Sequence, residues 1–210
     1  MTKELAIVGA SGHGKVIADI AEQLGYTVRF YDDAYPSKKN IEHWPIYGAC
    51  EDLIASSDGQ AENAVVAIGN NDIRAEKISL LQQHNFTLVT LIDPSAVISQ
   101  YAKIAPGCVV FPGAVINAFA SIGKGCIINT SAVVEHDCKL GDFTHICPNV
   151  ALAGGVSVGS KSWLGIGSQV KQLVSIGGNS LIGAGSTVIK NIPDNVTSFG
   201  SPAIVVTNNK

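Results

Sequence analysis

Residues 104–122 read Ile104-Ala-Pro-Gly-Cys-Val-Val110-Phe-Pro-Gly-Ala-Val-Ile116-Asn-Ala-Phe-Ala-Ser-Ile122, with an aliphatic side chain at every sixth position. The same spacing extends from Ile92 to Val188, which gives seventeen consecutive aliphatic residues without a gap. The residue four positions after each of them is usually small, and three of the five cysteines occupy such positions, namely Cys108, Cys126 and Cys138. Six residues turn an α-helix through about 600°, so a strict period of six cannot stay on one helix face. Helical structure is therefore excluded for this part of the chain.

A hexad of this kind suits a short strand followed by a corner, because it combines a bulky and a small inward residue with Gly, Asn or Asp between them. Three hexads close one triangular coil, and stacked coils pair each strand with those above and below at about 4.8 Å. Seventeen hexads make between five and six coils. Residue n then lies beneath residue n+18, which places His136 under Gly154, His145 under Trp163 and Asn129 under Cys147.

The chain changes character near Ile92-Asp93-Pro94. Residues 1–91 hold nineteen charged side chains, whereas the 102 residues from 92 to 193 hold ten. In the first part, apolar runs read as strands and the stretch up to Leu24 reads as a helix; the runs cover residues 5–8, 27–31, 64–68 and 87–92. This alternation predicts a small parallel βα domain over residues 1–91, half of a Rossmann fold, followed by the repeat domain over residues 92–210.

The first predicted strand leads into the glycine-rich loop Gly9-Ala-Ser-Gly12-His13-Gly14-Lys15. Such a loop lets a ligand approach the backbone, the next helix offers unpaired N–H groups, and an acid about 20 residues further on can bind ribose hydroxyls. Acidic and amide side chains follow the next two strands, at Asp32-Asp33 and Asn70-Asn71. The G-x-x-G-x-G spacing differs from the dinucleotide fingerprint, so we expect a nucleoside diphosphate rather than NAD. A turn that serves only close packing is the structural alternative.

Composition restricts the function further. The chain has 210 residues, 46% hydrophobic and 15% charged, with a formal net charge of -3 and only two arginines. This profile is that of a folded protein without a basic surface for nucleic acid. No apolar run approaches the roughly 18 residues needed to cross a bilayer, and the first residues do not resemble a signal peptide. Five cysteines without a C-x-x-C pair suit neither a disulfide framework nor a zinc site. We therefore expect a cytoplasmic protein without a metal or a membrane partner.

Four motifs follow one another in the chain: the glycine-rich loop, Asp32-Asp33, Ile68-Gly-Asn-Asn71, and a hexapeptide repeat that carries Val134-Glu-His-Asp137. In this order they resemble the bacterial hexapeptide-repeat sugar acetyltransferases. These include the N-acetyltransferases of UDP-linked 4-amino-sugars and the sialic acid O-acetyltransferases. The resemblance covers essentially the whole chain. It implies a left-handed parallel β-helix, acetyl-CoA as co-substrate, no metal, and a homotrimer that binds acetyl-CoA between neighbouring helices.

The resemblance also implies roles for residues of the repeat. His136 matches the general base of the family and Glu135 the carboxylate that orients it; an imidazole, with an ordinary pKa of about 6.5, suits proton removal from an amine at neutral pH. Gly154 matches the glycine placed against the acetyl group, where an N–H donor would meet the developing oxyanion. His145 resembles a second histidine near the thioester of acetyl-CoA, and Asn129 a sugar-contacting asparagine.

In the first domain, the resemblance places Gly12, His13, Gly14, Asp32, Asp33, Asn70 and Asn71 around the sugar nucleotide. Each candidate also has a structural explanation. His136 can be an exposed corner, His145 a corner packed under Trp163, His13 and the asparagines capping or turn residues, and Asp32 a strand-ending turn residue.

The sequence departs from the family pattern at two positions. Ile204 stands where a basic residue usually follows Pro202-Ala203, which puts a contact to the coenzyme phosphates in doubt. Asp137 stands where some relatives have Glu, and we expect little effect from it.

We expect an acetyl-CoA-dependent N-acetyltransferase of a UDP-linked 4-amino-sugar. A sialic acid O-acetyltransferase and a non-catalytic sugar-nucleotide scaffold remain as alternatives. A zinc hydratase on the same helix would need three histidines, and this repeat holds two.

Overall fold

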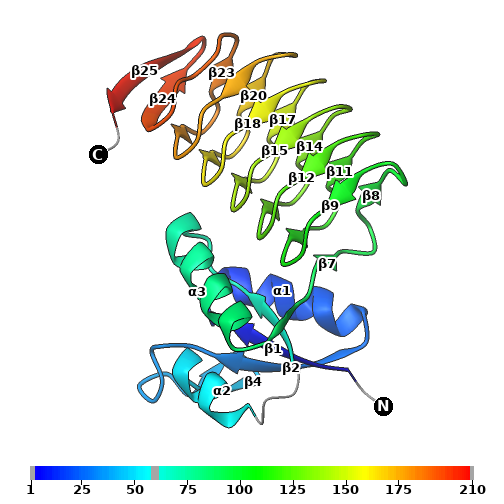
Figure 1. Cartoon of the computed structure of the whole chain (residues 1–210), viewed down its shortest axis with the longest axis vertical. Coiled ribbons are helices and arrows are strands. Elements are labelled where there is room, and N and C mark those ends of the chain that lie inside the picture. Colours follow the sequence, from blue (N-terminus) through cyan, green and yellow to red (C-terminus); the bar gives the residue numbers. More distant parts are fainter. Residues whose placement is uncertain (1–2, 58–61, 209–210) are drawn as a thin grey trace. The chain divides into compact units, whose positions relative to one another are not determined.

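The computed structural model describes residues 3–57 and 62–208. The chain divides into two compact units, Met1–Pro94 and Ser95–Lys210 (Figure 1). Each unit has its own sheet system and is described separately.

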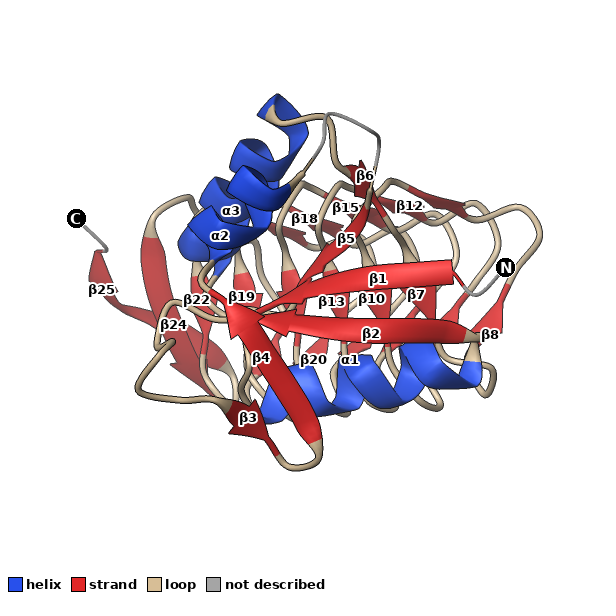
Figure 2. Ribbon diagram, turned by 90° about the horizontal axis from the view of Figure 1, so that it is seen from below, coloured by secondary structure: helices blue, strands red, loops and turns tan. Residues whose placement is uncertain are grey.

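The first unit is a six-stranded sheet with three helices. Its elements are β1 (Lys3–Val8), α1 (Gly12–Gln23), β2 (Tyr26–Tyr31), β3 (Asn40–Ile41), β4 (Trp44–Gly48), α2 (Cys50–Ser56), β5 (Asn63–Val66), α3 (Asn71–Gln83) and β6 (Thr87–Leu88). The strand order is β3-β4-β2-β1-β5-β6, and all pairs are parallel except β3 with β4. Figure 2 shows α1 on the far side of β2 from α2 and α3.

The apolar runs explain the central strands of this sheet. Leu5 and Ile7 on β1 are fully buried, as are Ile17 and Ile20 on α1, so the helix turns its apolar side inward. The expected run 87–92 is divided into two short strands, and the expected strand 64–68 ends at Val66. Strands β3 and β4 and helix α2 were not predicted, since Pro36, Pro45 and the charged residues around them hide any clear periodicity.

The second unit is a left-handed parallel β-helix; the period of six predicted the stacked coils, and the family resemblance implied their hand. Its first coil begins with β7 (Leu91–Ile92), which precedes the division at Pro94 but pairs with β10. The further strands are β8 (Val97–Ile98), β9 (Lys103–Ile104), β10 (Val109–Val110), β11 (Val115–Ile116), β12 (Ser121–Ile122), β13 (Ile127–Ile128), β14 (Val133–Val134), β15 (Lys139–Leu140), β16 (His145–Ile146), β17 (Ala151–Leu152), β18 (Ser157–Val158), β19 (Trp163–Leu164), β20 (Gln169–Val170), β21 (Ser175–Ile176), β22 (Leu181–Ile182), β23 (Thr187–Val188), β24 (Val196–Gly200) and β25 (Ala203–Asn208).

These strands form three sheets, one for each side of the triangular coil. Sheet I contains β7, β10, β13, β16, β19, β22, β24 and β25; sheet II contains β8, β11, β14, β17, β20 and β23; sheet III contains β9, β12, β15, β18 and β21. The chain passes through the sheets in the order I, II, III and then returns to I. The last two strands form an antiparallel hairpin at the end of sheet I.

The predicted register is confirmed, because each strand of a coil pairs in parallel with the strand eighteen residues later, for example Val115 with Val133 and His145 with Trp163. Every hexad aliphatic residue from Val110 to Val188 is buried. Ile92, Ile98 and Ile104 are only half-buried. The first coil has a neighbouring coil on one side only, which accounts for this difference. The corners between strands repeatedly adopt positive φ, including the corner residues Asp137 and Leu173 at 61°.

Candidate active site

His136 and Gly154 lie on one corner of the β-helix, where sheet II turns into sheet III. A Cβ atom on Gly154 would lie only 2.5 Å from both Cε1 and Nε2 of the His136 ring. The imidazole therefore occupies the space that a side chain at position 154 would fill. The backbone joins the two coils at the same point, because the N–H of Gly155 donates to the carbonyl oxygen of His136 at 2.9 Å.

The carboxylate beside the imidazole belongs to Asp137, which corrects the expectation that Glu135 orients the ring. Nδ1 of His136 lies 2.8 Å from Oδ2 of Asp137, whereas Oε2 of Glu135 accepts from the backbone N–H of His136 at 3.3 Å. Asp137 is itself a corner residue with a φ of 61°. An Nδ1–H that donates to Asp137 leaves Nε2, the nitrogen next to Gly154, as the basic atom.

A hollow of about 300 Å³ opens at this corner and is lined by His136, Asp137, Gly154, Gly155, Gln172 and Leu173. The imidazole is 62% exposed, so substrates can reach it. The N–H of Gly154 makes no hydrogen bond within residues 3–57 and 62–208, unlike that of Gly155. A base and a glycine with an unengaged backbone N–H thus line the same hollow, and this pair suits a reaction that deprotonates a nucleophile and builds charge on a carbonyl oxygen.

His145 and Asn129 form a second cluster on sheet I and its edge. His145 is buried on β16, and its ring stacks on that of Trp163 with centroids 5.8 Å apart and an interplanar angle of 22°. Nδ2 of Asn129 lies 3.3 Å from Nε2 of His145, and Oδ1 of Asn129 accepts from the N–H of Thr130 at 2.8 Å. The structure therefore joins Asn129 to His145 but does not bring either of them to the corner that holds His136.

In the first unit, a hollow of about 290 Å³ lies at the carboxyl ends of β1, β2 and β5, where open α/β sheets bind ligands. Its lining residues are Val8, Gly9, Ala10, Ser11, Asp32, Asp33, Ala67, Ile68, Gly69, Ile73 and Lys77. Two of the residues that the sequence predicted for this domain, Asp32 and Asp33, line the hollow. The other predicted residues of this domain do not line it, namely Gly12, His13, Gly14, Asn70 and Asn71.

Both aspartates already make hydrogen bonds or ion pairs with other groups of the protein. Asp32 accepts from the backbone N–H groups of Ala10 at 2.6 Å and Ala34 at 2.9 Å. Asp33 forms an ion pair with Lys77 at 2.6 Å, and this hydrogen bond lowers the pKa of Asp33 below its ordinary value. Sequence reasoning missed Lys77, because a lysine six positions after Asn71 on a helix carries no motif.

Asn70 and Asn71, which follow β5, stabilise the loop that leads into α3. The side chain of Asn70 caps α3 by accepting from the N–H groups of Asp72 and Ile73 at 3.0 and 3.1 Å. This is the capping role that the sequence analysis gave as the alternative to ligand binding. Oδ1 of Asn71 accepts from Arg74 at 2.8 Å. Arg74 is 1% exposed and also donates to the carbonyl oxygens of Ile68 at 3.0 Å and Gly69 at 2.9 Å. Sequence reasoning missed Arg74, although its being one of two arginines is a signal.

The glycines and the histidine of the loop differ in their surroundings. A Cβ on Gly14 would lie 2.5 Å from the carbonyl oxygen of Gly9, so Gly14 is needed for packing, whereas a Cβ on Gly12 would meet no atom within 4 Å. Burial, with the positive charge of Arg74 as a second cause, lowers the pKa of His13 to about 4. His13 is therefore neutral at pH 7.

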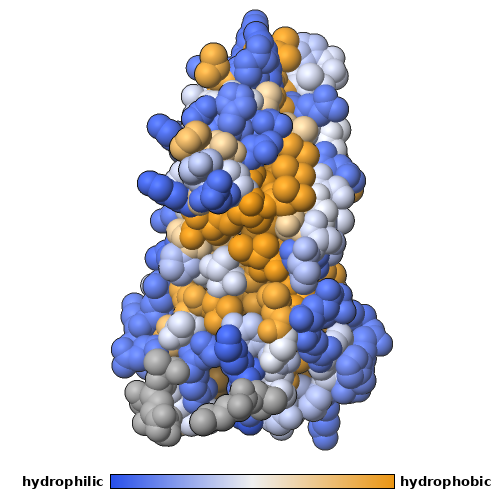
Figure 3. Space-filling model, turned by 90° about the vertical axis from the view of Figure 1, so that its right-hand side faces the viewer, coloured by the Kyte–Doolittle hydropathy of each residue, from blue (hydrophilic) through white to orange (hydrophobic). Residues whose placement is uncertain are grey.

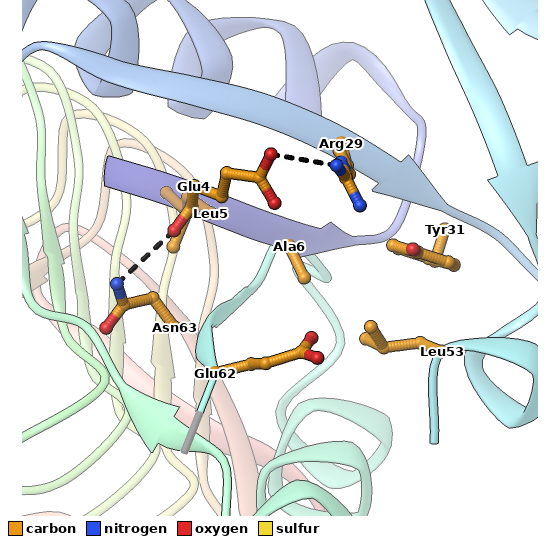
Figure 4. Close-up of a pocket in the computed structure, with 8 residues that line it drawn as sticks. All are labelled: Glu4, Leu5, Ala6, Arg29, Tyr31, Leu53, Glu62 and Asn63. Carbon is orange, nitrogen blue, oxygen red and sulfur yellow. Dashed lines mark hydrogen bonds and ion pairs between the residues drawn. The ribbon is translucent and has the colours of Figure 1, made fainter. Parts of the chain in front are cut away.

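A separate hollow of about 250 Å³ on the first unit contains none of the predicted residues (Figure 4). Arg29 pairs there with Glu4 at 2.8 Å, and both side chains are about half exposed, at 45% and 56%. Such a pair contributes little to stability.

The cysteines show no sign of catalysis. All five are free and buried, and burial raises the pKa of Cys147 to about 11. No group of three or more His, Cys, Asp or Glu side chains suited to a metal ion occurs among the described residues. In the same part of the chain, no helix is long and apolar enough to cross a membrane.

Residues 4–81 match the family model of the PglD N-terminal domain. A perosamine N-acetyltransferase variant from Caulobacter crescentus, solved with CoA and GDP-perosamine, is 36% identical, with a TM-score of 0.94 over 99% of each chain. The chain belongs to the bacterial hexapeptide-repeat sugar acetyltransferases. The acetyltransferase domain of PglB from Neisseria gonorrhoeae, solved with acetyl coenzyme A, is also 36% identical, with a TM-score of 0.93 over 98% of this chain and 100% of that one.

A curated relative of this sugar acetyltransferase is the UDP-N-acetylbacillosamine N-acetyltransferase of Bacillus subtilis, which is 37% identical over 112 residues. That match spans about half of each chain, 51% in both cases. The expected family and fold are confirmed.

Proposed function

We propose that this protein transfers the acetyl group of acetyl-CoA to the 4-amino group of a UDP-linked amino-sugar. The observation that carries this proposal is the pairing of His136 Nε2 with the unengaged N–H of Gly154 on one corner of the β-helix. The relatives that were solved with CoA, acetyl coenzyme A or GDP-perosamine support a sugar nucleotide and a coenzyme A thioester as substrates.

The reaction needs one proton transfer and one acyl transfer. The sugar amine attacks the thioester carbonyl carbon, and Nε2 of His136 takes the proton that the nitrogen loses. Negative charge develops on the carbonyl oxygen, where the N–H of Gly154 donates to it. The C–S bond then breaks, and the coenzyme A thiolate recovers the proton from the imidazolium. Asp137, 2.8 Å from Nδ1, stabilises the positive ring between these steps.

The nucleotide would occupy the hollow at the carboxyl ends of β1, β2 and β5 in the first unit. Ser11 at the start of α1 and the glycine-rich loop face this hollow, and N–H groups at a helix start favour phosphate oxygens. Asp32 and Asp33 lie where ribose or base would reach them, although their present hydrogen bonds would have to be shared or exchanged.

We further propose that the active site is completed by a neighbouring copy in a homotrimer. His136 stands at the corner of sheets II and III, whereas His145 belongs to sheet I, the opposite side of a three-sided coil. One chain therefore does not unite the two histidines. Sheet II offers a contact surface, because its outward residues Val97, Val115, Val133 and Ala151 form one apolar column, and Figure 3 shows apolar side chains gathered on one face of the β-helix.

The central test is His136→Ala assayed with acetyl-CoA and a panel of UDP- and GDP-linked 4-amino-sugars, with sialic acid as a hydroxyl acceptor. Loss of the base should lower kcat by roughly 10² or more without changing the oligomeric state. Wild-type turnover of the variant would disprove the role of His136. Turnover of sialic acid alone would establish the O-acetyltransferase, and a preference for the GDP-linked sugar would replace UDP as the nucleotide.

Shared active sites have their own test. His136→Ala and His145→Ala chains, each inactive by itself, are co-expressed and purified as mixed trimers. Because each site would draw His136 from one chain and His145 from the next, about a quarter of the sites should recover activity in a random mixture. A mixture that stays as inactive as its parents would contradict the shared site.

A further inference from the structure

Leu173 is the most exposed large apolar side chain among the residues that the structure describes, at 78%. It stands at a corner with φ of 61°, a conformation that side chains other than Gly, Asn and Asp rarely adopt. The exposure is unfavourable for a leucine, and no packing inside the chain accounts for it; the positive φ is shared with other corner residues such as Phe119 and Asp137. The position of Leu173 on the same corner as His136 gives a reason for this exposed leucine.

Leu173 and His136 reach toward the same pair of glycines from opposite sides. A Cβ on Gly154 would lie 2.5 Å from Nε2 of His136, and a Cβ on Gly155 would lie 2.8 Å from Cδ2 of Leu173. The two glycines therefore leave a slot at their own coil, with the imidazole of the coil below as its lower wall and the leucine of the coil above as its upper wall. The hollow is lined by six residues, and Leu173 has the one apolar side chain among them; Gln172 lies next to it in the chain.

We propose that Leu173 restricts the transferred acyl group to two carbons. This inference rests on the proposed acetyl transfer at His136 and Gly154. A thioester whose oxygen meets the Gly154 N–H and whose carbon is attacked beside His136 directs its methyl group along Gly155 toward Leu173. The isobutyl side chain covers that methyl group and occupies the volume that a longer acyl chain would need. In an apolar pocket one methylene changes kcat/KM by about 10- to 200-fold.

The test measures kcat/KM with acetyl-, propionyl- and butyryl-CoA for the wild type, Leu173→Ala and Leu173→Phe. The alanine variant should raise the butyryl-to-acetyl ratio at least about 10-fold, because it empties the far end of the slot. The phenylalanine variant should lower the propionyl-to-acetyl ratio below that of the wild type. Phe119→Ala is the matched control. Phe119 is an exposed apolar residue, 64%, on the same corner column with φ of 62°, but it does not line the hollow, so its removal should leave both ratios unchanged.

Wild-type ratios in both Leu173 variants would overturn the proposal. If Leu173 served only to pack against a neighbouring chain, sedimentation velocity would show altered assembly while the ratios stayed constant, and this outcome would also overturn it. Should Leu173→Ala fail to fold, Leu173→Phe and Leu173→Val supply the same comparison. Failure of the proposed function is distinguishable, because the wild type itself would then not acetylate any sugar nucleotide.

Discussion

The two hollows of this protein use their polar groups in opposite ways. In the first unit, Asp32 lines the hollow, Asn70 and Arg74 lie beside it, and all three are bonded to backbone groups of the surrounding loops. At the corner of the β-helix, Nε2 of His136 and the N–H of Gly154 face the hollow, and neither accepts or donates within the described part of the chain.

The difference follows from how each fold satisfies its backbone. Strand and helix ends in the βα unit leave donors and acceptors unpaired, so side chains must satisfy them. Stacked coils satisfy most backbone groups of the β-helix by repetition, and at this corner Nε2 of His136 and the N–H of Gly154 are left for chemistry. Substitutions of the buried polar residues around the first hollow should therefore reduce stability, whereas substitutions at the corner should reduce turnover alone.

The largest expected effect is on stability, from Arg74→Leu. The substitution leaves the carbonyl oxygens of Ile68 and Gly69 without their buried donor, and each buried acceptor left unsatisfied costs about 1–3 kcal/mol. Thermal unfolding measures the loss. The matched control is Arg29→Leu, which breaks an exposed pair with Glu4 (Figure 4) and should cost no more than about 1 kcal/mol. Equal losses of stability in Arg74→Leu and Arg29→Leu would show that the buried arginine is no more important for stability than the exposed one.

The second effect is a pH dependence of stability that comes from His13. Its pKa is about 4 in the folded chain and about 6.5 when unfolded, so between these values the unfolded chain binds more protons. Stability should therefore fall as pH decreases from 6.5 to 4, by up to about 3 kcal/mol from this residue. Denaturant unfolding of His13→Gln at pH 7 and 4.5 should show a smaller difference than the wild type. His84→Gln, at an exposed position, is the control and should retain the full difference.

At the β-helix corner, Gly154→Ala should lower kcat about 10²-fold at unchanged melting temperature. The new Cβ would lie 2.5 Å from the His136 ring and force it away from the thioester. Gly178→Ala is the control, because Gly178 has the same hexad position on another corner and a Cβ there meets nothing closer than 3.3 Å. Activity assays and thermal unfolding of Gly154→Ala and Gly178→Ala measure the loss of kcat and of stability separately. A Gly154 variant that loses stability but keeps its kcat would contradict the expectation that corner substitutions reduce turnover alone.

The smallest effect is expected from Asp137→Asn. Loss of the charge that faces Nδ1 should lower kcat about 10-fold, since this exposed pair is screened by solvent, while Asp137→Glu should recover most of the rate. Glu135→Gln should cost less than Asp137→Asn, because Glu135 accepts from the backbone rather than from the ring. The reverse ranking of the two carboxylates, measured at saturating substrate, would restore Glu135 as the orienting group.

The sequence by itself determined the β-helix, the eighteen-residue register and the stacking of His136 beneath Gly154. These follow from a strict period, in which every coil repeats the same inward residues and neighbours are set by arithmetic. It also located the first hollow, because strand ends of a parallel sheet gather at one edge.

The tertiary structure alone decided which polar groups are already bonded. Arg74, Lys77 and the contact of Asp137 with the imidazole depend on rotamers and on partners brought together by folding, and no period in the sequence specifies them.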